Sequence, residues 1–251
     1  MAVTYERYES VAVITLDRPT ALNAINADLS RELRESWERF NAEDDALVAV
    51  LTGAGRAFCA GLDMKEAAEA ARTGIPMAMG GGFDMRQVEK PTLAAVNGAC
   101  AGGGISFALG CDIILCSENA QFVLPFAARG RGGASTALNV AQRTSNSAAL
   151  YMALTAGRVH AAEALRIGLV HEVLPLDDLM PRALELAEKI AGHSQLSVRA
   201  LKRHIWNAME NGVPEAIKTA RMSERELVSD SREGAIAFDE KRRPRYTQES
   251  P

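Results

Sequence analysis

The stretch Asn97-Gly98-Ala99-Cys100-Ala101-Gly102-Gly103-Gly104 decides the fold, because an apolar, strand-like segment passes through three consecutive glycines into a helix. Glycines carry no Cβ, so a ligand can approach the backbone N–H groups at the positive end of that helix. A second stretch, Phe58-Cys59-Ala60-Gly61-Leu62-Asp63, has the same order of strand, glycine turn and helix. We interpret the two turns as the halves of an oxyanion hole, which can stabilise a developing enolate oxygen.

Strand-like and helix-like segments alternate around these turns. The segment Ala27 to Asn41 carries Leu29, Leu33, Trp37 and Phe40 at spacings of three and four, which predicts an amphipathic helix. Strands alternating with such helices indicate an α/β fold with parallel pairings. The predicted strands are Val11 to Leu16, Leu47 to Thr52, Thr92 to Val96, Asp112 to Cys116, Gln121 to Leu124 and Leu169 to Leu174.

The strand pattern stops near Leu176, and four amphipathic helices are predicted beyond it. Ser194 and Pro214 supply residues typical of helix starts. The chain then reaches a basic run, Lys241 to Arg245, predicted to lie on an exposed tail. The predicted helices are Leu176 to Ala191, Gln195 to Met209, Pro214 to Val228 and Ser231 to Phe238.

Composition restricts the classes of function. The 251 residues carry a net charge of −4, with a pI near 5.7, which argues against a general nucleic-acid or acidic-membrane surface. No apolar run has the length of a signal peptide or of a membrane span, so we expect a cytoplasmic protein. The four cysteines and four histidines show no paired ligand spacing. We therefore expect small buried thiols and no metal site.

The order of several motifs along the whole chain resembles the enoyl-CoA hydratase/isomerase family, also called the crotonase superfamily. The early motifs are Asp17-Arg18-Pro19 with Ala21-Leu22-Asn23-Ala24, Gly53 to Asp63, and Lys90-Pro91 with Val96-Asn97-Gly98. The later ones are Gly102 to Gly104 with Cys111-Asp112, Ala120-Gln121-Phe122, Ala161 to Ala164 with Gly168 to Val170, and Glu233-Gly234 with Phe238 and Glu240 to Arg242.

This resemblance implies a crotonase-like spiral of ββα units over residues 1–193 with the acyl-CoA site, and a helical oligomerisation part over residues 194–251. It implies a homotrimer or a hexamer made of two trimers. The ligand would be an acyl-CoA thioester, with coenzyme A as part of the substrate and no separate bound cofactor. By position, the oxyanion hole is predicted at the N–H groups of Ala60 and Gly103. The other residues implied to bind substrate are Leu62, Asp63, Met64, Phe83, Gly102, Gly104 and Lys241, the last towards the coenzyme A phosphates.

The chain departs from the family where the hydratases carry two catalytic glutamates. Those positions hold Ser106 and Phe126, neither of which can act as a base or acid near neutral pH. Either they take part in the reaction or Ser106 packs within its helix and Phe126 fills the acyl pocket. Arg129 and Arg131 follow closely. They either bind a carboxylate on the acyl group or face solvent or another subunit. The alternative carboxylates are Asp63, expected to be structural, Asp84 and Glu89.

Three functions remain open from the residues. The first is an enzyme that forms a thioester enolate without the glutamate pair, for which decarboxylation is a hypothesis because loss of CO₂ creates the enolate without a strong base. The second is an enoyl-CoA hydratase of unusual specificity. The third is a noncatalytic acyl-CoA-binding protein that keeps the oxyanion turns as a thioester clamp.

Overall fold

The computed structural model describes residues 1–75, 85–223 and 227–246. A six-stranded sheet forms its centre, in the order β1-β2-β3-β5-β7-β10. Only the β1–β2 hairpin is antiparallel in this sheet, and the remaining pairs are parallel. The strands are β1 (Val3–Tyr8), β2 (Val11–Leu16), β3 (Val48–Gly53), β5 (Thr92–Val96), β7 (Ile113–Ser117) and β10 (Glu172–Leu174).

A second, smaller sheet follows the order β4-β6-β8-β9. Each of its first three strands comes shortly after a strand of the large sheet, so that β3 leads to β4, β5 to β6 and β7 to β8. A helix follows each pair, which is the repeated ββα unit of a crotonase-like spiral. The strands are β4 (Ala57–Cys59), β6 (Ala99–Ala101), β8 (Gln121–Val123) and β9 (Val159–His160).

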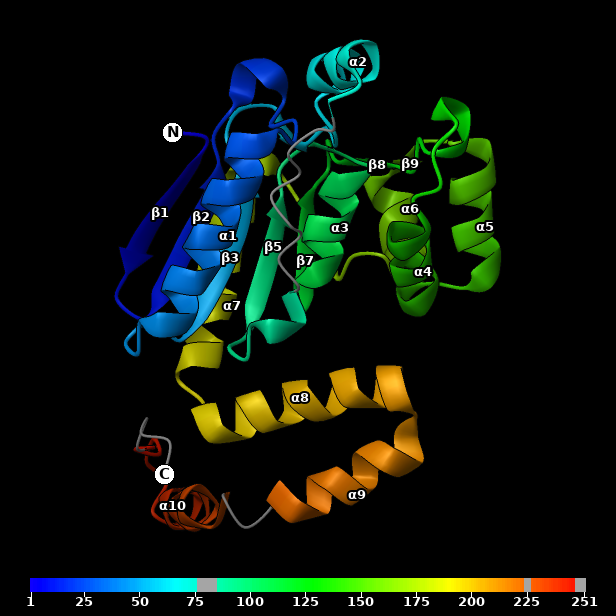
Figure 1. Cartoon of the computed structure of the whole chain (residues 1–251). Coiled ribbons are helices and arrows are strands. Elements are labelled where there is room, and N and C mark those ends of the chain that lie inside the picture. The colour runs from blue at the N-terminus through cyan, green and yellow to red at the C-terminus, as the bar shows by residue number, and fades with distance from the viewer. Residues whose placement is uncertain (76–84, 224–226, 247–251) are drawn as a thin grey trace.

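Helices cover both faces of the large sheet, as Figure 1 shows for α1 (Ala27–Ala42) on one face and α7 (Leu176–Ala191) on the other. The predicted stripe of α1 is buried, with Leu29, Leu33, Trp37 and Phe40 in the main core. A second core lies between the sheet and α7. Because both faces are covered, a central strand has no polar side, and all six residues of β3 are buried.

The remaining helices of residues 1–193 lie around the small sheet. The short helix α3 (Gly103–Gly110) follows β6 and is largely buried, whereas α2 (Met64–Thr73) stands at the edge of the molecule (Figure 1). The helices α4 (Ala134–Arg143), α5 (Asn146–Thr155) and α6 (Ala161–Arg166) gather beside β8 and β9 (Figure 1).

The last three helices lie away from the large sheet (Figure 1): α8 (Gln195–Asn211), α9 (Val213–Ser223) and α10 (Val228–Asp239). Side-chain contacts attach α8 to the core at Asp112. Lys202 forms a 2.8 Å ion pair with that carboxylate, and the indole N–H of Trp206 donates to it at 3.0 Å.

The division of the chain at residue 193 stays a prediction. Among the described helices, none combines the length and apolar character needed to cross a bilayer.

Sequence patterns located most elements correctly, with three kinds of difference. The strand expected over Leu169 to Leu174 is shorter, because Leu169 and Val170 are buried in the connection after α6 and only Glu172–Leu174 pair. The short strands β4, β6 and β9, the hairpin strand β1 and the helices α4 to α6 were not predicted. The helix expected over Pro214 to Val228 ends at Ser223, residues 224–226 lie outside the described part, and α10 begins at Val228, before the expected Ser231.

Candidate active site

The two glycine turns predicted from the sequence meet in the structure at Gly61. Its φ of +83° suits glycine, and a Cβ there would lie 2.7 Å from the carbonyl oxygen of Ala101 and 3.5 Å from the backbone nitrogen of Gly103. A side chain at position 61 would therefore separate the turn after β4 from the turn after β6. The absence of that side chain lets the two turns touch.

Glycine occupies the three positions from Gly102 to Gly104 for different structural reasons. Gly102 has φ +52° and ψ −117°, a conformation that side chains disfavour, and its N–H donates to the carbonyl of Val123 at 3.0 Å. A Cβ on Gly104 would lie 2.4 Å from the carbonyl oxygen of Cys59, so α3 packs directly against the end of β4. Gly103 begins α3 and lines a cavity of about 190 Å³.

The prediction that Ala60 supplies an oxyanion donor is wrong for this structure, because its N–H already donates to the carbonyl of Leu22 at 3.0 Å. A parallel bridge pairs Leu62 with Ile25 instead. The Ile25 N–H donates to Gly61 at 2.7 Å, and the Asp63 N–H donates to Ile25 at 2.9 Å. In such a bridge residues 61 and 63 bond towards Ile25, so the N–H of Leu62 is directed away from it.

Leu62 and Gly103 thus offer the pair of backbone donors that the sequence assigned to Ala60 and Gly103. Across residues 1–75, 85–223 and 227–246, neither of these two N–H groups donates a hydrogen bond. Both residues line the same cavity, with Ala60 and Gly61 beside them. Gly103 also lies at the first turn of α3, where the helix dipole favours negative charge. The local pattern could not reveal this exchange, because it depends on the distant segment Leu22 to Ile25.

An ion pair anchors the Leu62 turn from behind. Arg18 donates to Asp63 at 3.1 Å and to the carbonyl of Ala24 at 2.5 Å. Asp63 also caps α2 by accepting from the Lys65 N–H. Partial burial alone would raise the pKa of Asp63, but the hydrogen bonds from Arg18 and the backbone lower it below its usual range. Asp63 does not line the cavity, and its bonds to Arg18 and Lys65 support the turn, while its implied part in substrate binding stays a prediction.

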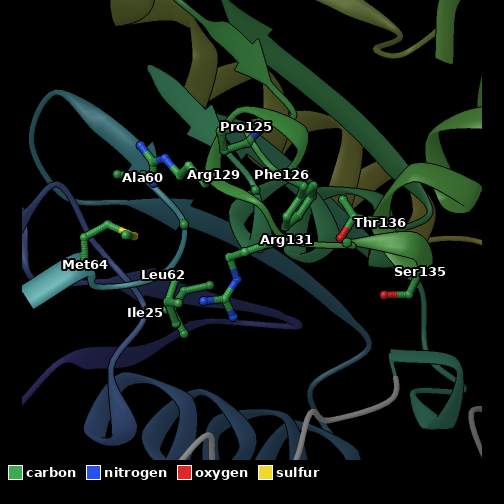
Figure 2. A pocket seen from close by; sticks show the side chains of 14 residues that line it. Ile25, Ala60, Leu62, Met64, Pro125, Phe126, Arg129, Arg131, Ser135 and Thr136 are labelled. Atoms are coloured by element: carbon green, nitrogen blue, oxygen red, sulfur yellow. The ribbon is translucent and has the colours of Figure 1, made fainter. Parts of the chain in front are cut away.

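Ser106 and Phe126 occupy the region expected for the glutamates, without acid or base chemistry. The Ser106 hydroxyl lies 2.6 Å from that of Thr136, a buried residue at the cavity wall. A Cβ on Gly133 would lie 2.3 Å from the Phe126 ring, so that ring packs on the bare glycine backbone. Figure 2 shows Phe126 beside Thr136 in the cavity. Sequence reasoning missed Thr136, which carried no motif of its own.

The other predicted site residues lie in different parts of the molecule. Arg129, Arg131 and Met64 line the cavity, and Figure 2 shows both arginine side chains there. Gly104 supports the turn without lining the cavity, and Glu89 lines a separate cavity against α8. Phe83 and Asp84 lie outside the described residues. Lys241 follows α10, which lies far from the two glycine turns within this chain (Figure 1).

Comparison with known proteins shows the family of this chain. The sequence model described as enoyl-CoA hydratase/isomerase matches residues 6–249. The chain belongs to the enoyl-CoA hydratase/isomerase family. Family membership makes it an enzyme of the lyase or isomerase kind that acts on acyl-CoA thioesters.

Relatives of this family match almost the whole chain. A carnitinyl-CoA dehydratase from Proteus mirabilis is 40% identical, covering 94% of this chain and 95% of that protein. An (E)-benzylidenesuccinyl-CoA hydratase from Thauera aromatica is 35% identical, covering 98% and 99%. The crystal structure of an enoyl-CoA hydratase/isomerase from Mycobacterium paratuberculosis has a TM-score of 0.90 at 32% identity, covering 99% of each chain. The family and its crotonase fold are therefore as the motifs indicated.

Proposed function

We propose that this enzyme binds an acyl-CoA thioester with its carbonyl oxygen between the N–H groups of Leu62 and Gly103 and stabilises the enolate formed from it. The observation that carries the proposal is the pair of N–H groups without a partner in the described structure, both in residues that line one cavity. Each preorganised donor of this kind contributes about 3 to 4 kcal/mol of transition-state stabilisation. Coenzyme A enters as part of the substrate.

The reaction proceeds without the glutamate pair of the hydratases. The cavity wall contains no Asp or Glu among the residues that the structure describes, and the hydroxyls of Ser106 and Thr136 are poor bases. Decarboxylation fits this wall. The bond from Cα to the carboxylate carbon breaks, its electron pair forms the enolate, CO₂ leaves, and solvent protonates Cα.

Hydration or dehydration is the second candidate, favoured by the activities in the names of the relatives. It requires a group that deprotonates water or removes the α-proton. The relatives' names also describe two unlike acyl groups, since a carnitinyl group carries a quaternary ammonium and a benzylidenesuccinyl group carries a free carboxylate. Family resemblance therefore leaves the charge of the acyl group open.

The oxyanion hole is tested by the infrared spectrum of bound butyryl-CoA labelled with ¹³C at the thioester carbonyl. Two hydrogen bonds to that oxygen lower its stretching frequency, so we expect a shift to lower frequency on binding. In Gly103→Ala, the added methyl group meets Ile25 at the cavity and should remove most of the shift. Gly192→Ala is the matched control, because its added Cβ makes only ordinary contacts far from the turns. An unshifted carbonyl in the wild-type complex would place the thioester elsewhere.

The reaction is tested separately on crotonyl-CoA and on malonyl- and methylmalonyl-CoA. Hydration is followed by loss of enoyl-thioester absorbance, and decarboxylation by release of CO₂. We expect CO₂ release and no hydration at enzymatic rates. Rapid hydration of crotonyl-CoA would favour the second candidate, with Asp84 the first residue to replace. Binding of butyryl-CoA with neither reaction would support a noncatalytic acyl-CoA-binding protein.

We also propose that the enzyme assembles as a homotrimer or as a hexamer of two trimers through its C-terminal helices. Exposed apolar side chains on these helices support the proposal. They are Leu201, Ile205 and Met209 on α8, Val213 and Ile217 on α9, and Val228, Ile236 and Phe238 on α10. Assembly would also explain how Lys241 reaches coenzyme A phosphates, by entering the site of a neighbouring subunit.

A further inference from the structure

Two exposed arginines, Arg129 and Arg131, project from one short loop at the wall of the cavity. Arg129 ends a short 3₁₀ turn (Ala127–Arg129), and Arg131 follows after Gly130, whose φ is +63°. The N–H groups of Arg129 and Arg131 donate to the same carbonyl oxygen, that of Phe126, at 3.0 and 2.9 Å. The loop is therefore wound tightly around one acceptor, and both side chains start from a constrained backbone.

Neither guanidinium is neutralised within the described structure. Other arginines of this chain pair with carboxylates, as Arg18 does with Asp63 and Arg182 with Glu172. In the ranges 1–75, 85–223 and 227–246, the side chains of Arg129 and Arg131 form no ion pair or hydrogen bond. The cavity wall contributes no acidic residue from those ranges. Because arginine stays protonated at all physiological pH values, the two side chains place two positive charges at the cavity, for which the described residues supply no carboxylate partner.

The position of these charges indicates which part of a ligand they meet. Arg131 lines the same cavity as Leu62, and Figure 2 shows its guanidinium directed towards Leu62 and Ile25. Arg129 extends past Ala60 in the same view. A thioester carbonyl bound at Leu62 and Gly103 thus lies within the cavity that the guanidinium groups line. The long pantetheine arm of coenzyme A separates the phosphates from that carbonyl.

We propose that Arg129 and Arg131 bind a free carboxylate on the acyl group. The substrate class is then the mono-CoA thioesters of dicarboxylic acids, in which one carboxyl group forms the thioester and the other stays free. The proposal rests on the oxyanion site proposed above. A guanidinium matches a carboxylate with two parallel N–H donors, and charge-assisted bonds of this type are stronger than neutral ones. The same two charges repel an acyl group that carries a quaternary ammonium. Charge in the cavity therefore selects between acyl groups that the family fold accommodates.

The test compares three acyl-CoA compounds of similar length by isothermal titration calorimetry on the full chain. Glutaryl-CoA carries a terminal carboxylate, valeryl-CoA is its uncharged counterpart, and 4-trimethylammoniobutyryl-CoA is cationic. We expect glutaryl-CoA to bind at least about tenfold more tightly than valeryl-CoA, as expected for charge-assisted bonds. The cationic compound should bind more weakly than either. Equal dissociation constants for glutaryl- and valeryl-CoA would overturn the proposal.

Variants identify the residues responsible. Arg129→Gln and Arg131→Gln should each reduce the preference for glutaryl-CoA, and the double variant should abolish it while valeryl-CoA still binds. Arg131→Lys keeps the charge but loses the paired donors, so part of the preference should remain. Arg7→Gln removes one positive charge from β1, away from the cavity, and is the matched control.

Free coenzyme A separates the two sources of negative charge. If the glutamine variants weaken free coenzyme A, valeryl-CoA and glutaryl-CoA by the same factor, the arginines hold phosphate and the proposal is wrong. If glutaryl- and valeryl-CoA bind equally and the bound butyryl-CoA carbonyl is still shifted, only the dicarboxylate proposal fails. If valeryl-CoA does not bind and the butyryl-CoA carbonyl shows no shift, the oxyanion proposal fails, and the dicarboxylate proposal fails with it.

Discussion

At the scale of single residues, the site depends on which backbone groups are already bonded. Leu62 and Ala60 are two positions apart and line the same cavity. Among the described residues the Ala60 N–H has an acceptor, the carbonyl of Leu22, and the Leu62 N–H has none. The segment Arg18 to Ile25 makes this distinction by bonding Ala60, Gly61 and Asp63. Ile25 of this segment lines the cavity, whereas Arg18 supports the Leu62 turn without lining it.

Removing the Arg18 side chain tests this positioning. Arg18→Met breaks the ion pair with Asp63 and the bond to the Ala24 carbonyl. We expect a smaller shift of the bound ¹³C-thioester carbonyl, because the Leu62 turn is less restrained, while butyryl-CoA affinity falls by less than about tenfold. Arg18→Lys should restore part of the shift. An unchanged carbonyl frequency in Arg18→Met, with the fold retained, would contradict the positioning role.

The four cysteine thiols provide a test that depends on pH. All four are buried, and burial raises the pKa of Cys59, Cys111 and Cys116 to about 12 and the pKa of Cys100 well above its usual value. The native protein should therefore not react with a disulfide reagent at pH 8, whereas all four thiols should react in guanidinium chloride. A thiol that reacts rapidly in the native state would show that its site opens.

The sign of the effect on stability follows from the same pKa values. A thiol whose pKa is raised by folding favours the folded state below pH 9, the usual pKa of the group, and this contribution is lost as pH rises towards 12. Urea unfolding should therefore show a lower free energy of unfolding at pH 10 than at pH 8. Replacing Cys116 by alanine should reduce that difference.

At the scale of elements, the attachment of α8 to the sheet depends on the Asp112 carboxylate. Asp112 lies directly before β7, and its carboxylate accepts hydrogen bonds from the N–H and hydroxyl of Thr92. The same carboxylate pairs with Lys202 and accepts from Trp206, both on α8. Lys202 also donates to the carbonyl of Lys90 at 2.8 Å. Two neighbouring strands and α8 thus meet at one charged group.

Lys202→Met should weaken this attachment more than removal of an ordinary surface charge. The Lys202 and Asp112 side chains are 9% and 20% exposed, so loss of the partner leaves a partly buried carboxylate under-compensated. We expect a loss of about 2 to 4 kcal/mol in the free energy of unfolding, measured by urea denaturation. Arg7→Met removes an exposed partner of Asp45 and should cost about 1 kcal/mol or less. Equal effects of the two substitutions would argue against this role for Asp112.

At the scale of the whole molecule, apolar side chains remain on the outer faces of the C-terminal helices. Phe238 of α10 is 87% exposed, and Leu201 and Ile205 of α8 are each 62% exposed. Large side chains of this kind favour burial against another surface. A trimer built through these helices would bury them, and it would bring the basic tail of one chain towards another.

Phe238→Asp should weaken the assembly, because it places a charge in the proposed contact. By light scattering after size-exclusion chromatography, we expect the wild-type protein at three or six times its chain mass of 26.9 kDa, and Phe238→Asp at a lower mass. Tyr8→Asp, at an exposed aromatic residue of β1, is the control and should leave the mass unchanged. A monomeric wild-type protein would contradict the proposal.

Local patterns were sufficient for the features that depend on neighbours along the chain. The apolar runs predicted β2, β3 and β5, the spacing of Leu29, Leu33, Trp37 and Phe40 predicted α1, and the ordered motifs indicated the family. The glycine turns were also visible, because only glycine tolerates the backbone of Gly61 and Gly102 without strain. Each of these signals comes from short-range sterics or from the periodic burial of one face.

The tertiary structure decided which groups of the site are available. A bond to Leu22 engages the Ala60 N–H, whereas Ile25 bonds to Gly61 and Asp63 and not to Leu62. Thr136 reaches Ser106 from another helix, and Glu89 lines a cavity against α8. These contacts join segments that are distant in sequence, and no local propensity encodes which groups become hydrogen-bond partners in the folded chain. The charge at the cavity also depends on tertiary structure. Arg129 and Arg131 carry a charge in any fold, but only the folded loop after β8 brings both to one cavity.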